Sequence, residues 1–467
     1  MGADKSNILS VRNVCQRKKG VQTLDFCSME VFHGEIYGVL VVEGHGVKDL
    51  IDLLLHNTEI EYGRVEYCHK LVNSGSLTVR PAENRIYLVS SVSCLIAHQT
   101  IAENFSIGSF PGNSFLYRPR RIRRILEEYF KQYGIDISPE KRVSELTPFE
   151  QLEIELIKAA ASGYSLIILD NSVLRLGEKD LQKLHSFMRT LTQYGSTFLY
   201  FCQHHETLKK VCDRIAIFGQ GKIRHVYEDY SEITRDARVF GQSIYKYNED
   251  IKPSVCSGRP VEMFRWLGTP VLAAEGDIIF VYDDKPDILR EIGLSLKKDD
   301  PESRIFIDFS HFEDFLDQDD TYLNNLCFYI GEKKKGFWAN RRNRESIRLE
   351  LKEELGPCIN DLTLYNTPRK DKLNILYYGA MLASPSILIC KYPLYELDIP
   401  LRYHVLTLLM KCKKQGITVV MLSSELYDLL FVSDRLVISR HGKVRQYDRN
   451  HYDQVLDLFP DSIPDFT

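Results

Sequence analysis

The sequence predicts an α/β protein made of two copies of one domain, each with a mainly parallel sheet covered by helices. Three observations support this prediction: the length, the alternation of apolar strand-sized runs with helical stretches, and an internal repeat. At 467 residues the chain is about three times as long as a typical single domain. Strands that are buried on both faces read as continuous apolar runs, which is typical of parallel sheets.

The repeat can be followed segment by segment. The first half contains, in order, Ser165–Asp170, Ser196–Phe201, a C-D-R-I-A-I-F segment at 212–218, and Gly221-Lys222. The second half contains, in the same order, Ser386–Lys391, Ile417–Leu422, an S-D-R-L-V-I segment at 433–438, and Gly442-Lys443. Asp170 and Asp213 are 43 residues apart, and so are Lys391 and Asp434. Equal spacing of equivalent segments indicates a duplicated domain.

Upstream of these segments, Gly34-Glu35 precedes one apolar strand and Gly276-Asp277 precedes the other. Between the two copies, residues 245–260 (Y-K-Y-N-E-D-I-K-P-S-V-C-S-G-R-P) are polar and rich in turn-forming residues, which is typical of a linker. The predicted domains are therefore residues 1–244 and 261–467, joined by the linker 245–260.

The composition excludes several classes of protein. Hydrophobic residues make up 44% and charged residues 27% of the chain, which is typical of a folded globular protein. The formal net charge of −4 gives no overall nucleic-acid-binding signature. No apolar run reaches the roughly 18 residues of a membrane span, and the first residues lack the apolar core of a signal peptide. The eleven cysteines form no C-x-x-C pair, so the sequence favours a reduced, cytoplasmic protein without a zinc site.

Several motifs carry a family resemblance. The first half has T-I-A-E-N at 100–104, G-I-D-I-S-P at 134–139, V-S-E-L at 143–146 and the D-R to G-K segment at 213–222, and the second half has L-S-S-E-L at 422–426. In these motifs the chain resembles the tandem ATP-binding subunits of sugar-importing ABC transporters of the ribose, galactose and xylose type. The resemblance covers about nine-tenths of the chain. It implies two ABC-type nucleotide-binding domains, each with an antiparallel β subdomain and a helical subdomain. It also implies ATP and Mg²⁺ as ligands and a membrane permease as partner.

The resemblance assigns the phosphate-binding loop of the first half to residues 42–49 (V-E-G-H-G-V-K-D), where the family has G-x-x-x-x-G-K-S. Val42 and Val47 replace the two fixed glycines, and a branched side chain obstructs the close backbone approach that phosphate needs. Lys48 is either a vestigial phosphate ligand or a surface lysine at the start of a helix. Asp49 stands where the metal-binding hydroxyl should be, and its charge opposes polyphosphate, with metal binding by the carboxylate as the alternative. The vestigial candidates in this loop are Gly44, Gly46, Lys48 and Asp49.

Four other positions of the first-half site follow from the resemblance. Ser91 replaces the glutamine that senses the γ-phosphate, and Asp170 remains as the candidate metal ligand. Asn171 replaces the catalytic glutamate, and an amide cannot accept a proton, which typically costs about 10²–10⁴-fold in rate. Gln203 takes the place of the switch histidine, although a shift of one residue in the alignment would place His204 there.

The second-half site departs further from the family. No glycine remains between Ile278 and Asp287, and carboxylates occupy three of those positions. Lys391 replaces the metal-binding aspartate and Tyr392 the catalytic glutamate, so the local charge is inverted.

The two signature loops have also changed. In the first, L-T-P-F-E at 146–150, Thr147 keeps a hydroxyl that is a candidate contact for nucleotide, while Pro148 and Phe149 replace two glycines. Its counterpart at 367–371 (T-P-R-K-D) retains nothing of the pattern.

Two basic clusters, at 118–124 and 333–344, are interpreted as solvated subdomain surfaces, with contact to anionic lipid or an acidic partner as the alternative for the first. The leading hypothesis is a pseudo-ATPase that acts as a binding, scaffold or regulatory partner of a membrane permease or another membrane protein, at the inner face of the plasma membrane. One alternative is an energising ATPase subunit that couples hydrolysis to carbohydrate uptake. A further alternative is a sensor that binds Mg-ATP in the first half alone without cleaving it. Nucleic acid is not expected as a partner.

Overall fold

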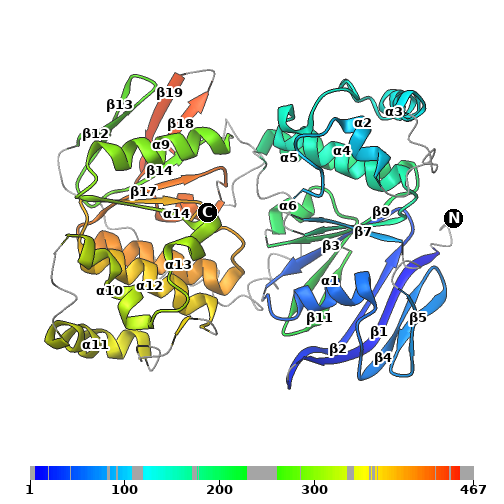
Figure 1. Ribbon diagram of the computed structural model, residues 1–467, viewed down its shortest axis with the longest axis horizontal. Helices are drawn as coiled ribbons and strands as arrows, with labels where there is room; N and C mark the ends of the chain where they lie inside the picture. The colour runs from blue at the N-terminus through cyan, green and yellow to red at the C-terminus, as the bar shows by residue number, and fades with distance from the viewer. Residues whose placement is uncertain are drawn as a thin grey trace. The chain divides into compact units, whose positions relative to one another are not determined.

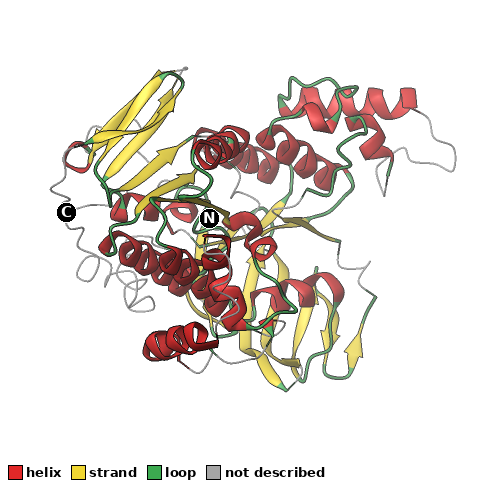
Figure 2. Cartoon of the chain, turned by 60° about the vertical axis from the view of Figure 1, so that its left-hand side comes forward, coloured by secondary structure: helices red, strands yellow, loops and turns green. Residues whose placement is uncertain are grey.

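The computed structural model divides the chain into two compact units, unit 1 (Met1–Gly241) and unit 2 (Gln242–Thr467), and each is described by itself. The structure describes residues 6–452, apart from 19, 43, 81–84, 91–92, 108–118, 171–175, 177, 204, 229–259, 284, 334–340, 357–358, 360–362, 365–366, 426 and 441–442. The predicted linker 245–260 lies, except for Pro260, outside the described residues. In each unit a central sheet is covered by helices (Figures 1 and 2).

The central sheet of unit 1 has six strands in the order β11-β10-β3-β9-β8-β7. These are β3 (Ile36–Val41), β7 (Ile86–Ser90), β8 (Leu166–Asp170), β9 (Thr197–Cys202), β10 (Arg214–Gly219) and β11 (Lys222–Tyr227). All neighbouring pairs are parallel except β10 and β11, which form an antiparallel pair. Every residue of β3 and β9 is buried, which explains why these segments read as continuous apolar runs.

A second, antiparallel sheet of unit 1 has the order β2-β1-β4-β5-β6. Its strands are β1 (Asn7–Lys18), β2 (Val21–Phe32), β4 (Tyr62–Tyr67), β5 (Lys70–Ser74) and β6 (Leu77–Thr78). The helix α1 (Val47–His56) shares one hydrophobic core with both sheets, to which it contributes buried side chains such as Leu50 and Leu54. The position of α1 therefore depends on the antiparallel sheet as well as on the central one.

The central sheet of unit 2 repeats that of unit 1 strand for strand, in the order β15-β16-β17-β14-β18-β19. Its strands are β14 (Ile278–Tyr282), β15 (Arg304–Asp308), β16 (Ile387–Lys391), β17 (Thr418–Ser423), β18 (Arg435–Arg440) and β19 (Lys443–Asp448). The predicted α/β class and the duplication are thus confirmed. The two copies differ in their antiparallel part, which in the described residues of unit 2 is only the hairpin β12 (Val261–Trp266) and β13 (Thr269–Ala273).

Helices cover the sheets of both units. Unit 1 also contains α2 (Ile101–Ser106), α3 (Pro119–Tyr133), α4 (Pro148–Ala161), α5 (Glu178–Gln193) and α6 (His205–Lys209). Unit 2 contains α9 (Pro286–Asp299), α10 (Tyr322–Lys333), α11 (Arg341–Leu355), α12 (Arg369–Ala383), α13 (Ile399–Lys414) and α14 (Tyr427–Val432). Short 3₁₀ turns lie at Val143–Glu145, Phe309–Phe315 and Arg449–His451. In the part of the chain that the structure describes, no helix has the length and hydropathy of a membrane span.

The glycine–acid and Asp-Arg motifs of the repeat form the same polar contacts in both units. In unit 1 the buried Glu35 pairs with Arg214 at 2.8 Å, and Asp213 accepts the backbone N–H of Ile36 at 2.8 Å. In unit 2, Arg435 pairs with Asp277 at 3.0 Å, and Asp434 accepts the N–H of Ile278 at 2.8 Å. These motifs persist in both copies because they fix the start of one central strand against its neighbour.

Candidate functional site

The loop between β3 and α1 has a backbone shape that only glycine can supply at Gly46. Gly46 lies in the left-handed region at φ 83° and caps the N-terminus of α1. A Cβ atom there would lie 2.2 Å from the carbonyl oxygen of Thr23 and 3.0 Å from the Cα of Gly221. The N–H of Val47 donates to the carbonyl of Gly44 at 3.3 Å. Gly46 is therefore required for packing against the β1–β2 hairpin, whether or not the loop binds phosphate.

Lys48 and Asp49 have different environments in the first turn of α1. The side chain of Lys48 is exposed. The carboxylate of Asp49 forms an ion pair of 2.8 Å with Nζ of Lys18, at the end of β1. The hydrogen bond to Asp49 raises the pKa of Lys18 above its ordinary value. The Asp49 carboxylate, which the resemblance places at the hydroxyl of the family motif, is thus held by Lys18, a cation of the chain itself.

Asp170 and Gln203 come to the same edge of the central sheet as this loop. Asp170 is the last residue of β8, in register with Ser90 of β7 and Phe201 of β9. Gln203 follows the end of β9, which lies between β8 and β3. Carboxyl ends of neighbouring parallel strands meet at one edge, where α/β proteins bind ligands. Ser91, Asn171 and the alternative His204 belong to the same edge in sequence, but they lie outside the described residues.

Thr147 acts as a helix cap in the structure. Its hydroxyl accepts the N–H of Glu150 at 3.2 Å, and its own N–H donates to the Glu150 carboxylate at 2.7 Å, which completes a capping box at the start of α4. Backbone groups at a helix start otherwise lack partners, so this cap stabilises α4. Partial burial opposes ionisation of Glu150, but its pKa is lowered overall, because the carboxylate accepts the Thr147 N–H, interacts with the Thr147 hydroxyl and faces Lys141.

This capping role predicts the effect of a small change. We expect Thr147→Ala to lower the free energy of unfolding of unit 1 by about 1 kcal/mol, because an alanine cannot accept the Glu150 N–H. Thr147→Ser keeps the hydroxyl and should stay within about 0.5 kcal/mol of the wild type. Hydrogen exchange of the α4 amides measures both. An equal loss of protection in the two variants would argue against the cap.

In unit 2 the segment between β14 and α9 is the one that the resemblance places at the phosphate-binding loop. After β14, the buried Asp283 accepts the N–H of Lys285 at 2.9 Å. Lys285 then caps α9, which begins with a proline at Pro286. Asp284 lies outside the described residues. The segment contains no glycine in sequence, and a carboxylate occupies the backbone N–H of Lys285.

Lys391 occupies in unit 2 the sheet position that Asp170 occupies in unit 1. Asp170 is in register with Ser90, and Lys391 is in register with Asp308 on the equivalent neighbouring strand. Nζ of Lys391 lies 2.9 Å from the Asp308 carboxylate, and both side chains are largely buried. The ammonium also lies over the ring of Tyr392, 5.2 Å from its centroid. A buried ion pair therefore occupies the carboxyl ends of β15 and β16.

Tyr392, which the resemblance places at the position of the catalytic glutamate, adopts a left-handed backbone conformation at φ 50°. Its N–H donates to the carbonyl of Leu422 at 2.8 Å, and its side chain is buried. Such a conformation is costly for an aromatic residue, so the surrounding packing must impose it.

Sequence reasoning missed the partners of these site residues. Lys18, Asp308 and Arg402 carry no motif, and each pairs with a residue distant in the chain. Glu425, in the L-S-S-E-L motif that supports the resemblance, lies 3.3 Å from Nη2 of Arg402 on α13, and Arg402 is buried. No local pattern could have identified these pairs.

The predicted basic clusters are only partly described. Arg120, Arg121 and Arg124 are exposed on α3, and Arg124 pairs with Glu128 at 3.6 Å. Arg118, together with most of the second cluster, lies outside the described residues or has no described side chain. Among the described residues, no three His, Cys, Asp or Glu side chains are grouped so that they could hold a metal ion.

Comparison with known proteins places this geometry in context. No protein-family model matches the chain. A galactose/methyl galactoside import ATP-binding protein of Pasteurella multocida is 23% identical over 484 residues, covering 94% of each chain. An arabinose import ATP-binding protein of Rhizobium meliloti is 22% identical over 501 residues, covering 96% of this chain and 95% of the relative. A ribose import ATP-binding protein of Oceanobacillus iheyensis is 25% identical over 392 residues, covering 75% and 77%.

Solved structures similar to the chain cover about one half of it. A nucleotide-free ATP-binding cassette from an ABC transporter is 18% identical, with a TM-score of 0.43, and covers 49% of this chain and 94% of that one. An ATP-binding cassette of an ABC transporter in its ADP conformation is also 18% identical, with a TM-score of 0.45, and covers 52% and 99%. The sequence relatives, by contrast, match both halves. Over about nine-tenths of its length, the chain is a relative of the tandem ATP-binding subunits of sugar-importing ABC transporters.

Proposed function

We propose that the chain is a non-hydrolysing member of this group, a pseudo-ATPase that serves as a binding, scaffold or regulatory subunit for a membrane permease. The observation that carries the proposal is the buried ion pair of Lys391 with Asp308, 2.9 Å apart at the sheet edge where the resemblance expects a metal ligand. An ammonium cannot ligate a cation, and it repels one. A lysine already paired with a carboxylate at 2.9 Å also neutralises the nearest acid that could hold Mg²⁺ in its place.

In unit 1 the charges and backbone contacts at the start of α1 support the proposal. The Asp49 carboxylate is paired with Lys18 at 2.8 Å, so the α1 start has, where the family motif has a hydroxyl, an anion that opposes polyphosphate and that a cation of the chain already holds. Within the loop, the Val47 N–H, which precedes Lys48, is donated to the Gly44 carbonyl. In sequence, Asn171 supplies no carboxylate to activate water. The residues present therefore do not fit a tightly bound Mg-triphosphate, and we derive no hydrolytic step through one.

The proposed partner follows from the relatives. Their names describe import ATP-binding proteins, and such a subunit acts together with a membrane component. Because the fold and the repeat contacts are kept while the phosphate chemistry is altered, we propose that binding to that component is the retained role, at the inner face of the plasma membrane. The same names favour the second candidate function, an energising ATPase subunit for sugar uptake.

A phosphate-release assay with a matched variant separates the two candidates. We expect purified protein with Mg-ATP to release phosphate no faster than its Lys48→Ala variant, because the proposed pseudo-ATPase does not hydrolyse ATP. Any equal release by the two proteins would come from contaminating ATPases. Turnover by the wild type that exceeds Lys48→Ala by about tenfold or more would establish the energising subunit and refute our proposal. Lys48 is exposed, so its truncation should leave the fold intact.

Calorimetric titration addresses the sensor hypothesis. We expect no saturable heat with Mg-ATP at up to millimolar concentration. Saturation at one site per chain, lost in Lys48→Ala and without turnover, would instead assign nucleotide sensing to unit 1.

A further inference from the structure

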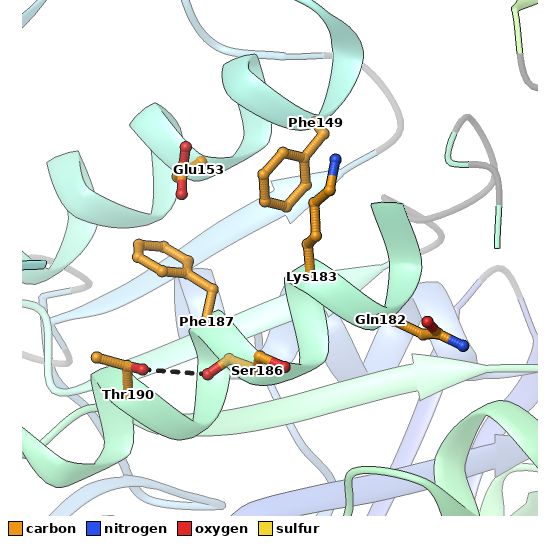
Figure 3. A pocket seen from close by; sticks show the side chains of 7 residues that line it. All are labelled: Phe149, Glu153, Gln182, Lys183, Ser186, Phe187 and Thr190. Atoms are coloured by element: carbon orange, nitrogen blue, oxygen red, sulfur yellow. Dashed lines mark hydrogen bonds between the residues drawn. The ribbon is translucent and has the colours of Figure 1, made fainter. Parts of the chain in front are cut away.

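An open pocket of about 640 Å³ lies between α4 and α5 in unit 1. Phe149 and Glu153 come from α4, and the other lining residues come from α5 (Figure 3). The α5 residues are Gln182, Lys183, Ser186, Phe187 and Thr190. All seven side chains belong to one unit and are described. The pocket combines two aromatic rings with one half-buried carboxyl group, and the proposed function uses neither.

The aromatic wall of this pocket includes a position at which the chain departs from the family motif. Phe149 stands where the resemblance places a glycine of the signature loop. The capping box of Thr147 and Glu150 and the proline at Pro148 fix the first turn of α4, and thereby fix Phe149 beside α5. The residue at this motif position thus supplies one side of the pocket. Phe187 of α5, which is largely buried, supplies the apolar surface across from it.

The charges around the pocket leave a net attraction for a cation. Lys183 is the cation among the residues that line the pocket. Its Nζ atom lies 2.7 Å from the carboxylate of Asp180 and 5.3 Å from the centroid of the Phe149 ring. Glu150 of α4 lies close enough to Glu153 to repel it, while Lys183 of α5 attracts it. Burial, with the repulsion from Glu150, raises the pKa of Glu153 to about 7. A second cation would stabilise the ionised carboxylate that burial disfavours.

We infer that the α4–α5 pocket binds a basic amphipathic helix of a partner protein, with an arginine or lysine side chain directed at Glu153 and apolar side chains on Phe149 and Phe187. The pocket is open and lies between two helices, which suits a helix laid in a groove. A guanidinium that enters between the two rings gains a cation–π contact and a charge-assisted hydrogen bond to the carboxylate. The inference goes beyond the proposed function, because it needs neither nucleotide nor a permease.

The test uses a pair of peptides that differ in one charge. The probe is an acetylated and amidated alanine-based helical peptide, with one arginine flanked by leucines three residues before and four residues after it. The control peptide carries citrulline in place of the arginine, which keeps the shape and removes the charge. At pH 8, with full-length protein, we expect the arginine peptide to bind about tenfold more tightly than the citrulline peptide, since charged hydrogen bonds are the stronger ones.

The preference should depend on Glu153 and on pH. Below pH 7 the carboxyl group becomes protonated, so the preference should disappear by about pH 5.5 and be complete at about pH 8.5. Glu153→Gln should abolish the preference at every pH without unfolding unit 1. Phe149→Ala should weaken both peptides, and the arginine peptide more, because only the arginine also loses a cation–π contact. Glu127→Gln, on the exposed surface of α3, should change neither. Binding of the arginine peptide near pH 7 should also release protons, which calorimetry in buffers of different ionisation enthalpy detects.

Three results would overturn the inference: no binding of either peptide at millimolar concentration, equal binding of the two at pH 8, or a preference that survives in Glu153→Gln. None of these results depends on ATP turnover, so failure here and failure of the proposed function are distinguishable.

Discussion

Replacing Lys391 by methionine should destabilise unit 2 by about 3–5 kcal/mol, because it leaves the Asp308 carboxylate buried without its cation. The two side chains are 8% and 14% exposed, so little water reaches the pair to compensate. Hydrogen exchange of the β16 amides, compared with the β8 amides of unit 1 as an internal reference, measures the loss. Unit 1 should be unaffected.

The double variant Lys391→Met with Asp308→Asn is the matched control. The asparagine removes the unpaired charge and keeps an oxygen that can accept the Ser310 N–H, which Asp308 now accepts at 3.1 Å. We therefore expect the double variant to recover most of the stability that the single change loses. Lys222→Ala breaks a solvent-exposed pair with Asp25 and should cost no more than about 1 kcal/mol. A cost that small for Lys391→Met itself would show that the buried pair does not hold the sheet edge.

A second large effect is expected at Gly46. Gly46→Ala should destabilise unit 1 by roughly 2–6 kcal/mol, because left-handed strain costs about 1–3 kcal/mol and overpacking about 1–3 kcal/mol more. The added methyl group would lie 2.2 Å from the Thr23 carbonyl oxygen, which is too close without movement of the β1–β2 hairpin. Denaturant unfolding of unit 1, followed by hydrogen exchange of β1 and α1, is the measurement.

Gly195→Ala separates strain from crowding. Gly195 has a similar positive φ of 93°, but a Cβ atom added there would have open space around it, with no atom beyond its chain neighbours within 4 Å. Its substitution should therefore show the backbone cost alone, about 1–3 kcal/mol. Equal losses at the two glycines would mean that the hairpin yields easily, and Gly46 would then not be a packing requirement.

The fold could be predicted from the sequence in considerable detail. The four apolar runs of the repeat became β8, β9, β16 and β17, each starting within one residue of its predicted first residue. The prediction succeeded because burial on both faces leaves a continuous apolar signal in the local sequence. It was less complete for the antiparallel part of unit 2. Alternating half-buried strands leave a weaker signal in the sequence than fully buried ones. In the described residues of unit 2, the antiparallel part is only the hairpin β12–β13.

The candidate site was predictable as a set of positions but not as a set of contacts. The resemblance assigned Asp170, Gln203 and the loop before α1 to one site, and the parallel strands bring them to one edge. The role of Thr147 as a helix cap could also have been read from its spacing to Glu150, which is the capping-box pattern. The roles assigned to Ser91 and Asn171 stay predictions.

By itself the sequence determined the duplication, the α/β class and the positions of the buried strands along the chain, because apolar periodicity and spacing are local properties of the chain. The tertiary structure alone decided which charges meet. Lys391 and Asp308 are 83 residues apart and Arg402 and Glu425 are 23 apart, and each pair forms only when separate elements pack together. The same holds for the pocket between α4 and α5, whose rings and carboxyl group come from two helices with a strand between them in the chain. Ion pairs and cavities depend on distances in space, which no local pattern encodes.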